Sequence, residues 1–215
     1  MRAQEMFTLI IEHLEPCLNK WLLKEYEIAS KLYEGRVVFT NVKKHETVLE
    51  RLGIVVKESV TELLKDRSDV IILDPKADTF LKPDELKKAE YVVVGGIMGS
   101  HPPNGRTWRF ITSRLPSAVA RSIGEHQYTI AGAVHVLKLI EGGKDVNNVK
   151  YIFGFKAKKK INSLVELEVE LPYAFPVDDE GNLLLPEEYF KVIVEHVPVY
   201  EARVLASDQD VCKDE

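Results

Sequence analysis

An apolar strand runs directly into a glycine- and proline-rich loop in the stretch Tyr91-Val92-Val93-Val94-Gly95-Gly96-Ile97-Met98-Gly99-Ser100-His101-Pro102-Pro103-Asn104-Gly105-Arg106-Thr107. The apolar run is typical of a buried β-strand, and its abrupt end indicates a rigid loop. Glycines let a backbone approach a ligand closely, while the Pro102-Pro103 pair fixes φ and removes two hydrogen-bond donors. Because a run of arginines follows, we favour a ligand-binding loop over an ordinary turn.

Strands and helices alternate ahead of this loop. The patterns predict strands at residues 7–11, 37–40, 54–56, 70–73 and 91–94, and helices at residues 16–33, 44–52, 60–64 and 83–89. In the first helix, Glu25 and Glu27 are expected to point outward. Such alternation predicts an α/β fold with a mostly parallel sheet flanked by helices.

The chain length and its apolar runs limit the number of domains and the possibility of a membrane span. With 215 residues the chain can form one large domain with its own core. We expect a single domain over residues 1–205 and a disordered tail over residues 206–215. No apolar stretch approaches the roughly 20 residues of a membrane span, and the N-terminus lacks the pattern of a signal peptide. No membrane partner is therefore expected.

Charge and cysteine content exclude several classes of protein. The net charge of −5 and the pI of about 5.8 argue against a generic polyanion binder. Residues 100–124 are a local exception, because they contain no acid but include Arg106, Arg109, Arg114 and Arg121. The two cysteines, Cys17 and Cys212, lie near opposite ends without clustered histidines. They predict neither a disulfide scaffold nor a metal site, and they fit a reducing, cytoplasmic location.

Three places besides the glycine loop are candidates for a ligand crevice, which open α/β sheets build at the carboxyl ends of strands. Glu12-His13 follows the first strand, although Glu12 could instead belong to the first turn of the next helix. Asp74-Pro75 follows another strand, where Asp74 could orient a hydroxyl or cap a turn. Thr129 is a good N-cap for a helix at residues 130–141, so residues 125–128 would lie beside free helix amides.

The C-terminal part is predicted to form a further strand, a turn and a helix. Residues 165–171 alternate between apolar and acidic side chains, which predicts a strand, and a turn at 178–182 and a helix at 186–193 follow. Residues 150–160 carry lysines but no acid. They could be a phosphate-facing patch or a solvated turn between strands.

A family resemblance rests on three stretches: Ile10-Ile11-Glu12-His13-Leu14-Glu15, Gly95-Gly96-Ile97-Met98-Gly99-Ser100-His101-Pro102-Pro103, and residues 124–136. It extends to Glu170-Leu171-Pro172-Tyr173 and Leu185-Pro186-Glu187, and so covers nearly the whole chain. Together they resemble the SPOUT class of S-adenosylmethionine-dependent methyltransferases. The similarity is greatest to the branch with the eukaryotic arginine methyltransferase of a small-subunit ribosomal protein and archaeal predicted RNA methyltransferases.

The resemblance implies a C-terminal trefoil knot and a bent cofactor, S-adenosylmethionine, held by the loops after three strands. It implies cofactor-binding residues at Leu73, Asp74, Pro75, Gly95, Gly96, Ile97, Gly99, His101, Gln127, Tyr128, Thr129, Ile130 and Ala133. His101 could equally pack within its loop. The sequence departs from the branch at Ser100, where Asp is usual, and at Gln127-Tyr128-Thr129, where Gln-Met-Thr is usual. The loss of a carboxylate bears on the acceptor more than on the cofactor.

Methyl transfer needs alignment of acceptor and methyl rather than a metal, and three hypotheses for the acceptor follow. For an arginine of a ribosomal protein, Glu12, Asp74 or Glu125 would hold the guanidinium and accept its proton. For RNA, Arg106 and Arg109, helped by Arg114 and the lysines of residues 156–160, would bind phosphates. The third is a non-catalytic module that docks on ribosomal components. Either a monomer or a knot-mediated homodimer is expected.

Overall fold

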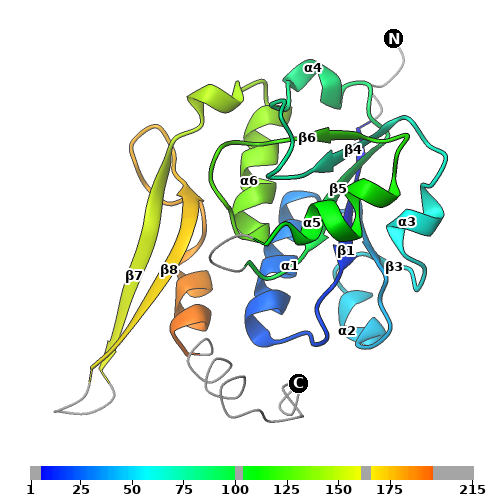
Figure 1. Ribbon diagram of the computed structural model, residues 1–215. Coiled ribbons are helices and arrows are strands. Elements are labelled where there is room, and N and C mark those ends of the chain that lie inside the picture. The colour runs from blue at the N-terminus through cyan, green and yellow to red at the C-terminus, as the bar shows by residue number, and fades with distance from the viewer. Residues whose placement is uncertain (1–5, 100–103, 161–165, 196–215) are drawn as a thin grey trace.

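A parallel six-stranded sheet forms the centre of the computed structural model, which describes residues 6–99, 104–160 and 166–195 (Figure 1). The strand order is β3-β2-β1-β5-β4-β6, and every neighbouring pair is parallel. The strands are β1 (Thr8–His13), β2 (Val37–Thr40), β3 (Ile54–Val55), β4 (Val70–Leu73), β5 (Tyr91–Gly96) and β6 (Val119–Arg121). The predicted fold class, a mostly parallel sheet flanked by helices, is confirmed.

The two long helices, α1 and α6, begin at capping residues that the sequence supplies. Asn19 accepts a hydrogen bond from the Leu22 amide, so the first helix begins at Lys20 rather than at residue 16. Thr129 caps α6 in the same way through the Gly132 amide, as predicted. The helices are α1 (Lys20–Leu32), α2 (Glu46–Leu49), α3 (Val60–Leu63), α4 (Pro83–Leu86), α5 (Arg106–Phe110) and α6 (Ile130–Glu141). Two short 3₁₀ turns span Thr112–Arg114 and Val146–Asn148.

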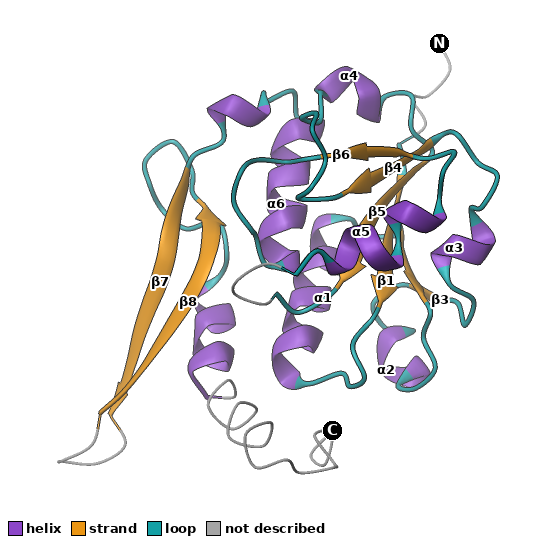
Figure 2. Ribbon diagram, viewed as in Figure 1, coloured by secondary structure: helices purple, strands orange, loops and turns teal. Residues whose placement is uncertain are grey.

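Both faces of the sheet are covered, as its alternating side chains require (Figure 2). On one face, Val92 and Val94 of β5 pack in the cluster that includes α1 and α6. On the other face, Val93 packs with α3 and with residues 110–115. Helices and loops therefore cover both faces of the sheet, and the loops that follow the strands lie at its carboxyl edge.

An antiparallel hairpin and a final helix form a second packed unit beside α1 and α6. Its strands are β7 (Tyr151–Lys160) and β8 (Glu166–Pro176). Side chains of β8 pack with Ile28 of α1, Ala131 of α6 and the helix at residues 187–195. The interpretation of residues 150–160 as a turn is therefore wrong, because residues 151–160 pair with β8 over their length.

Four other predictions concern the knot, the domain bounds, membrane helices and the cysteines. The knot, the single domain over 1–205 and the tail over 206–215 stay predictions, and the tail lies outside the described residues. Within the described ranges, no helix is both long and apolar enough to cross a bilayer. Cys17 is buried, and Cys212 lies outside the described residues.

The buried His13 makes the stability of the fold depend on pH. Its Nδ1 lies 2.9 Å from the Tyr26 hydroxyl at the end of β1. Burial, helped by the nearby His45, lowers the pKa of His13 to about 4. The unfolded chain binds this proton near pH 6.5, so the free energy of unfolding falls as the pH drops from there towards 4.

We predict that His13→Gln removes this share of the pH dependence, because glutamine does not titrate and can still hydrogen-bond Tyr26. Between about pH 7.5 and about pH 5, the unchanged chain should lose about 2 kcal/mol more unfolding free energy than the variant. Urea unfolding at both pH values measures this difference. Equal losses in the two proteins would contradict the prediction.

Candidate active site

One cavity lies where the loops after β4 and β5 meet the start of α6. The predicted residues on its wall are Leu73, Asp74, Pro75, Gly95, Ile97, Gly99, Gln127, Tyr128, Thr129, Ile130 and Ala133. Residues 104–107, at the start of α5, close another side. The structure thus brings together three loops that are far apart in the sequence. Their binding of a cofactor stays a prediction.

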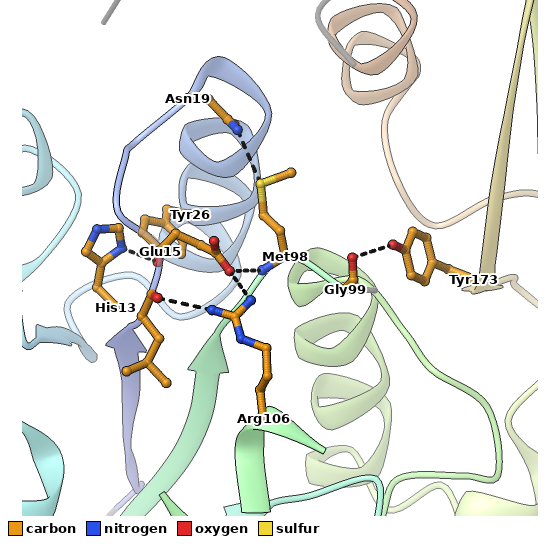
Figure 3. Close-up of polar contacts among 9 residues, drawn as sticks. His13, Glu15, Asn19, Tyr26, Met98, Gly99, Arg106 and Tyr173 are labelled. Atoms are coloured by element: carbon orange, nitrogen blue, oxygen red, sulfur yellow. Dashed lines mark hydrogen bonds and ion pairs between the residues drawn. The ribbon is translucent and has the colours of Figure 1, made fainter. Parts of the chain in front are cut away.

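The loop after β5 is fixed by hydrogen bonds to its backbone (Figure 3). The Met98 amide donates to Glu15 Oε1 at 2.9 Å, and the Leu14 amide donates to the Gly96 carbonyl at 3.2 Å. On the other side, the Tyr173 hydroxyl donates to the Gly99 carbonyl at 2.9 Å. The connection between β1 and α1 and the hairpin strand β8 therefore hold the loop from opposite sides.

The two adjacent glycines at the end of β5, Gly95 and Gly96, have different surroundings. Gly95 lines the cavity, and a Cβ there would meet Ile97 Cδ1 at 2.9 Å and Thr107 Oγ1 at 3.4 Å. Gly96 is not on the cavity wall. A Cβ at Gly96 would collide with the Tyr26 hydroxyl and with the Glu12 carbonyl oxygen at 2.8 Å. Gly96 thus permits close packing of β5 against β1 and α1, and the structure does not place it with the other predicted cofactor residues.

Asp74 lines the cavity, but its carboxylate is also used by the surrounding loop. It is 2% exposed and accepts hydrogen bonds from Thr112 Oγ1 at 2.6 Å and from the Lys76 amide at 2.9 Å. The second bond is the turn-capping contact that the sequence left open as an alternative. Asp74 therefore shapes one wall, and its catalytic role stays a prediction.

The other two carboxylates predicted to be catalytic lie away from the cavity wall. Glu12 is 1% exposed and accepts from Thr40 Oγ1, Ser59 Oγ and the Val60 amide at 2.5–2.9 Å. It belongs to β1, so its assignment to the first turn of the next helix is wrong. Glu125 is exposed in the loop before α6. Neither residue is among those that line the cavity.

The two arginines predicted to bind substrate, Arg106 and Arg109, lie in different surroundings. Arg106 lines the cavity, and its guanidinium donates to Glu15 Oε1 at 2.7 Å and to the Leu14 carbonyl at 3.2 Å (Figure 3). Arg109 is exposed, and its guanidinium lies over the Phe110 ring at 4.4 Å. His101 and Ser100 lie outside the described residues, so their predicted roles cannot be placed here.

Several residues of the site were not predicted as such. Lys76 and His126 line the cavity, while Glu15 and Tyr173 hold its loop. Glu15 and Tyr173 belong to the stretches that carry the family resemblance, and this is the feature of the sequence that could have identified them. Among the described residues, no group of three His, Cys, Asp or Glu side chains is placed to hold a metal ion.

Glu25 corrects the expectation that its side chain points outward. It is 3% exposed and accepts hydrogen bonds from Trp21 Nε1 at 2.8 Å, from the Tyr189 hydroxyl at 2.5 Å and from the Ala131 amide. Charge alone predicts a solvated position, but Glu25 lies four residues after Trp21 on the apolar stripe of α1. The i, i+4 spacing of these two residues could have indicated the contact.

Comparisons with known proteins agree with this arrangement. A family model described as "Protein arginine N-methyltransferase SFM1-like" matches residues 8–199. The protein arginine N-methyltransferase SFM1 of Saccharomyces cerevisiae is 29% identical over 202 residues, which cover 86% of this chain and 92% of that protein.

Solved structures share the fold. The yeast arginine methyltransferase SFM1 complexed with SAM has a TM-score of 0.73 and 24% identity, covering 90% of this chain and 93% of that one. The dual specific Trm10 of Thermococcus kodakaraensis has a TM-score of 0.51 and 16% identity, covering 65% and 95%. Since the family model spans residues 8–199, the chain belongs to the SFM1-like family of protein arginine N-methyltransferases, which confirms the predicted resemblance.

Proposed function

We propose that this chain transfers a methyl group from S-adenosylmethionine to an arginine side chain of a protein, and that the substrate is a ribosomal protein. The observation that carries the proposal is the cavity formed by the ends of β4 and β5 and the start of α6. These are the three places that the family resemblance assigns to the cofactor.

The residues of the cavity fit S-adenosylmethionine. Ile97, Ile130 and Ala133 supply apolar walls for an adenine ring, and Gly95 leaves room for a close backbone contact. Lys76 lines the same cavity and is a cation that suits the carboxylate of the methionine part. The cofactor supplies an activated methyl group on a sulfonium, so the task of the chain is to bind and align the acceptor.

The charges of the described residues favour a protein acceptor over RNA. Lys156 and Lys158 on β7 lie 3.3 and 3.4 Å from carboxylates of β8, at Glu170 and Glu168. Arg106 is paired with Glu15, and Arg121 with Glu85. Much of the basic surface suggested by the sequence is therefore neutralised by neighbouring acids, whereas the net charge of −5 suits a basic peptide.

We predict that Gly95→Ala and Gly96→Ala have opposite effects, because the two positions face different surroundings. Gly95→Ala should weaken S-adenosylmethionine binding roughly tenfold or more with under about 1 kcal/mol of lost stability, since its Cβ meets movable side chains of the cavity wall. Gly96→Ala should cost roughly 1–3 kcal/mol by overpacking β5 against the β1 backbone, with near-normal affinity in the folded fraction. Calorimetry and urea unfolding measure the two quantities. The reverse pattern would remove Gly95 from the site.

We predict methyl transfer to protein rather than to nucleic acid. Purified chain is incubated with labelled S-adenosylmethionine and intact ribosomes, and the product is digested with either protease or ribonuclease. The label should be lost with protease and kept with ribonuclease, and acid hydrolysis should release it as methylarginine.

Two outcomes would overturn this proposal. Label that survives protease but disappears with ribonuclease would identify RNA as the acceptor. Absence of cofactor binding in calorimetry at millimolar S-adenosylmethionine would reject both enzyme hypotheses and leave the ribosome-docking module. Gly95→Ala serves as the low-affinity control in the same transfer assay.

A further inference from the structure

A small side cavity adjoins the cavity assigned to the cofactor. Trp21, Glu25 and Tyr173 line only the side cavity, whereas Met98, Gly99 and Thr129 line both. A ligand in the side cavity would therefore lie next to one in the main cavity. The side cavity measures about 10 Å³, which is room for about one water molecule, so a larger ligand requires a shift of the flexible Met98 side chain.

Glu25 is a buried carboxylate without a cationic partner. Its three hydrogen bonds come from neutral groups, namely the Trp21 indole, the Tyr189 hydroxyl and the Ala131 amide. Within the described part of the chain, Glu25 forms no ion pair. A buried charge without a counter-charge is costly, so its retention beside a cavity points to a ligand that supplies the positive charge.

We propose that the side cavity is the pocket of the acceptor arginine and that Glu25 binds its guanidinium, an inference that rests on the proposed methyl transfer. Trp21 and Tyr173 also line the side cavity, and aromatic rings are favourable neighbours of a guanidinium plane and its apolar stem. In the reaction, an electron pair of a guanidinium nitrogen forms the N–CH₃ bond while the S–CH₃ bond breaks. The proton released from that nitrogen passes to the Glu25 carboxylate.

The other carboxylates near the cavities differ from Glu25 in partner or in place. Glu15 is paired with Arg106, and Asp74, which accepts from the Thr112 hydroxyl and the Lys76 backbone amide, lines the main cavity and not the side cavity. Glu12 lies in β1 among Thr40, Ser59 and Val60, outside both cavities. Glu25 is thus the carboxylate on the wall of the side cavity that retains an unpaired charge.

The titration of Glu25 agrees with this geometry. Burial raises the pKa of Glu25 to about 7, against the opposing effect of its hydrogen bonds. The titratable groups around it are Tyr26 on α1, Tyr173 on β8 and Tyr189 on the last helix. Burial holds the pKa values of Tyr26 and Tyr189 well above 10. A carboxylate that titrates near neutrality can both bind a cation and accept a proton.

The indole of Trp21 provides a reporter that does not depend on catalysis. The chain has two tryptophans, and Trp108 is 52% exposed on α5, away from both cavities. The ligand probe is Nα-acetyl-L-arginine amide, and its neutral isostere is the corresponding citrulline amide. Both are titrated into ¹⁵N-labelled chain while the two indole N–H signals are recorded by NMR.

The arginine amide should shift the Trp21 signal saturably, whereas the citrulline amide should bind at least roughly tenfold more weakly because it lacks the charge. The Trp108 signal should not move with either compound. Without ligand, the Trp21 signal should titrate near pH 7, and the arginine amide should move this midpoint to lower pH. A Trp21 signal that is unchanged at saturating arginine amide would overturn the inference.

A matched pair of variants gives the kinetic test. Glu25→Gln keeps the size and one acceptor oxygen, so kcat/KM for ribosomal protein should fall roughly a hundredfold while S-adenosylmethionine affinity stays within about threefold. Glu27→Gln, on the same helix with an exposed carboxylate paired to Lys24, should match the unchanged chain. A normal transfer rate in Glu25→Gln would overturn the inference without touching the proposed function. If the unchanged chain does not bind S-adenosylmethionine, the proposed function is rejected. The NMR titration would still show whether the side cavity binds an arginine side chain.

Discussion

The site depends on the need to satisfy the backbone of the glycine loop after β5. A loop between a buried strand and a cavity exposes amides and carbonyls that must find partners. Glu15 accepts from the Met98 amide, and Tyr173 donates to the Gly99 carbonyl. In Figure 3, the loop residues Met98 and Gly99 lie between these two side chains. Because Glu15 follows β1 and Tyr173 belongs to β8, the same bonds that shape the cavity also join the hairpin to the sheet.

The electrostatics of the molecule follow a consistent pattern. Several basic side chains have an acidic neighbour, as in the pairs Arg106–Glu15 and Arg121–Glu85 and in the pairs of Lys156 and Lys158 with glutamates of the hairpin. Exposed pairs of this kind contribute little to stability, but they cancel local positive potential that would attract a polyanion. Glu12, Asp74 and Glu25 are instead buried among neutral donors, and of these three carboxylates Glu25 lines the side cavity. A negative charge without a counter-charge at that place suits a cationic acceptor.

The position of Glu25 also couples the site to the packing of three elements. The residue lies on α1, accepts from the first turn of α6 and bonds Tyr189 on the last helix. Free amides at a helix N-terminus attract a carboxylate, so Glu25 supports the end of α6 whose preceding residues line the main cavity. Residues that recognise an acceptor and residues that hold the cofactor loop thus share one scaffold. A ligand bound to Glu25 would therefore contact the residue that supports the start of α6, beside the cofactor cavity.

The sequence by itself determined β1 to β5, β8 and the capping of α6 by Thr129, because apolar periodicity and local capping are properties of neighbouring residues. It also determined the family, through the motifs around Glu12 and Gly96. Only the tertiary structure decided that Glu12 is bonded away from the cavity and that Gly96 faces Tyr26. It also decided that β7 is a strand whose Lys156 and Lys158 pair with glutamates of β8. It alone showed that Glu25 is buried, since the donors that surround this charge come from Trp21, Ala131 and Tyr189. Contacts between residues more than a hundred positions apart leave no periodic trace in the chain, and burial of a charge depends on such contacts.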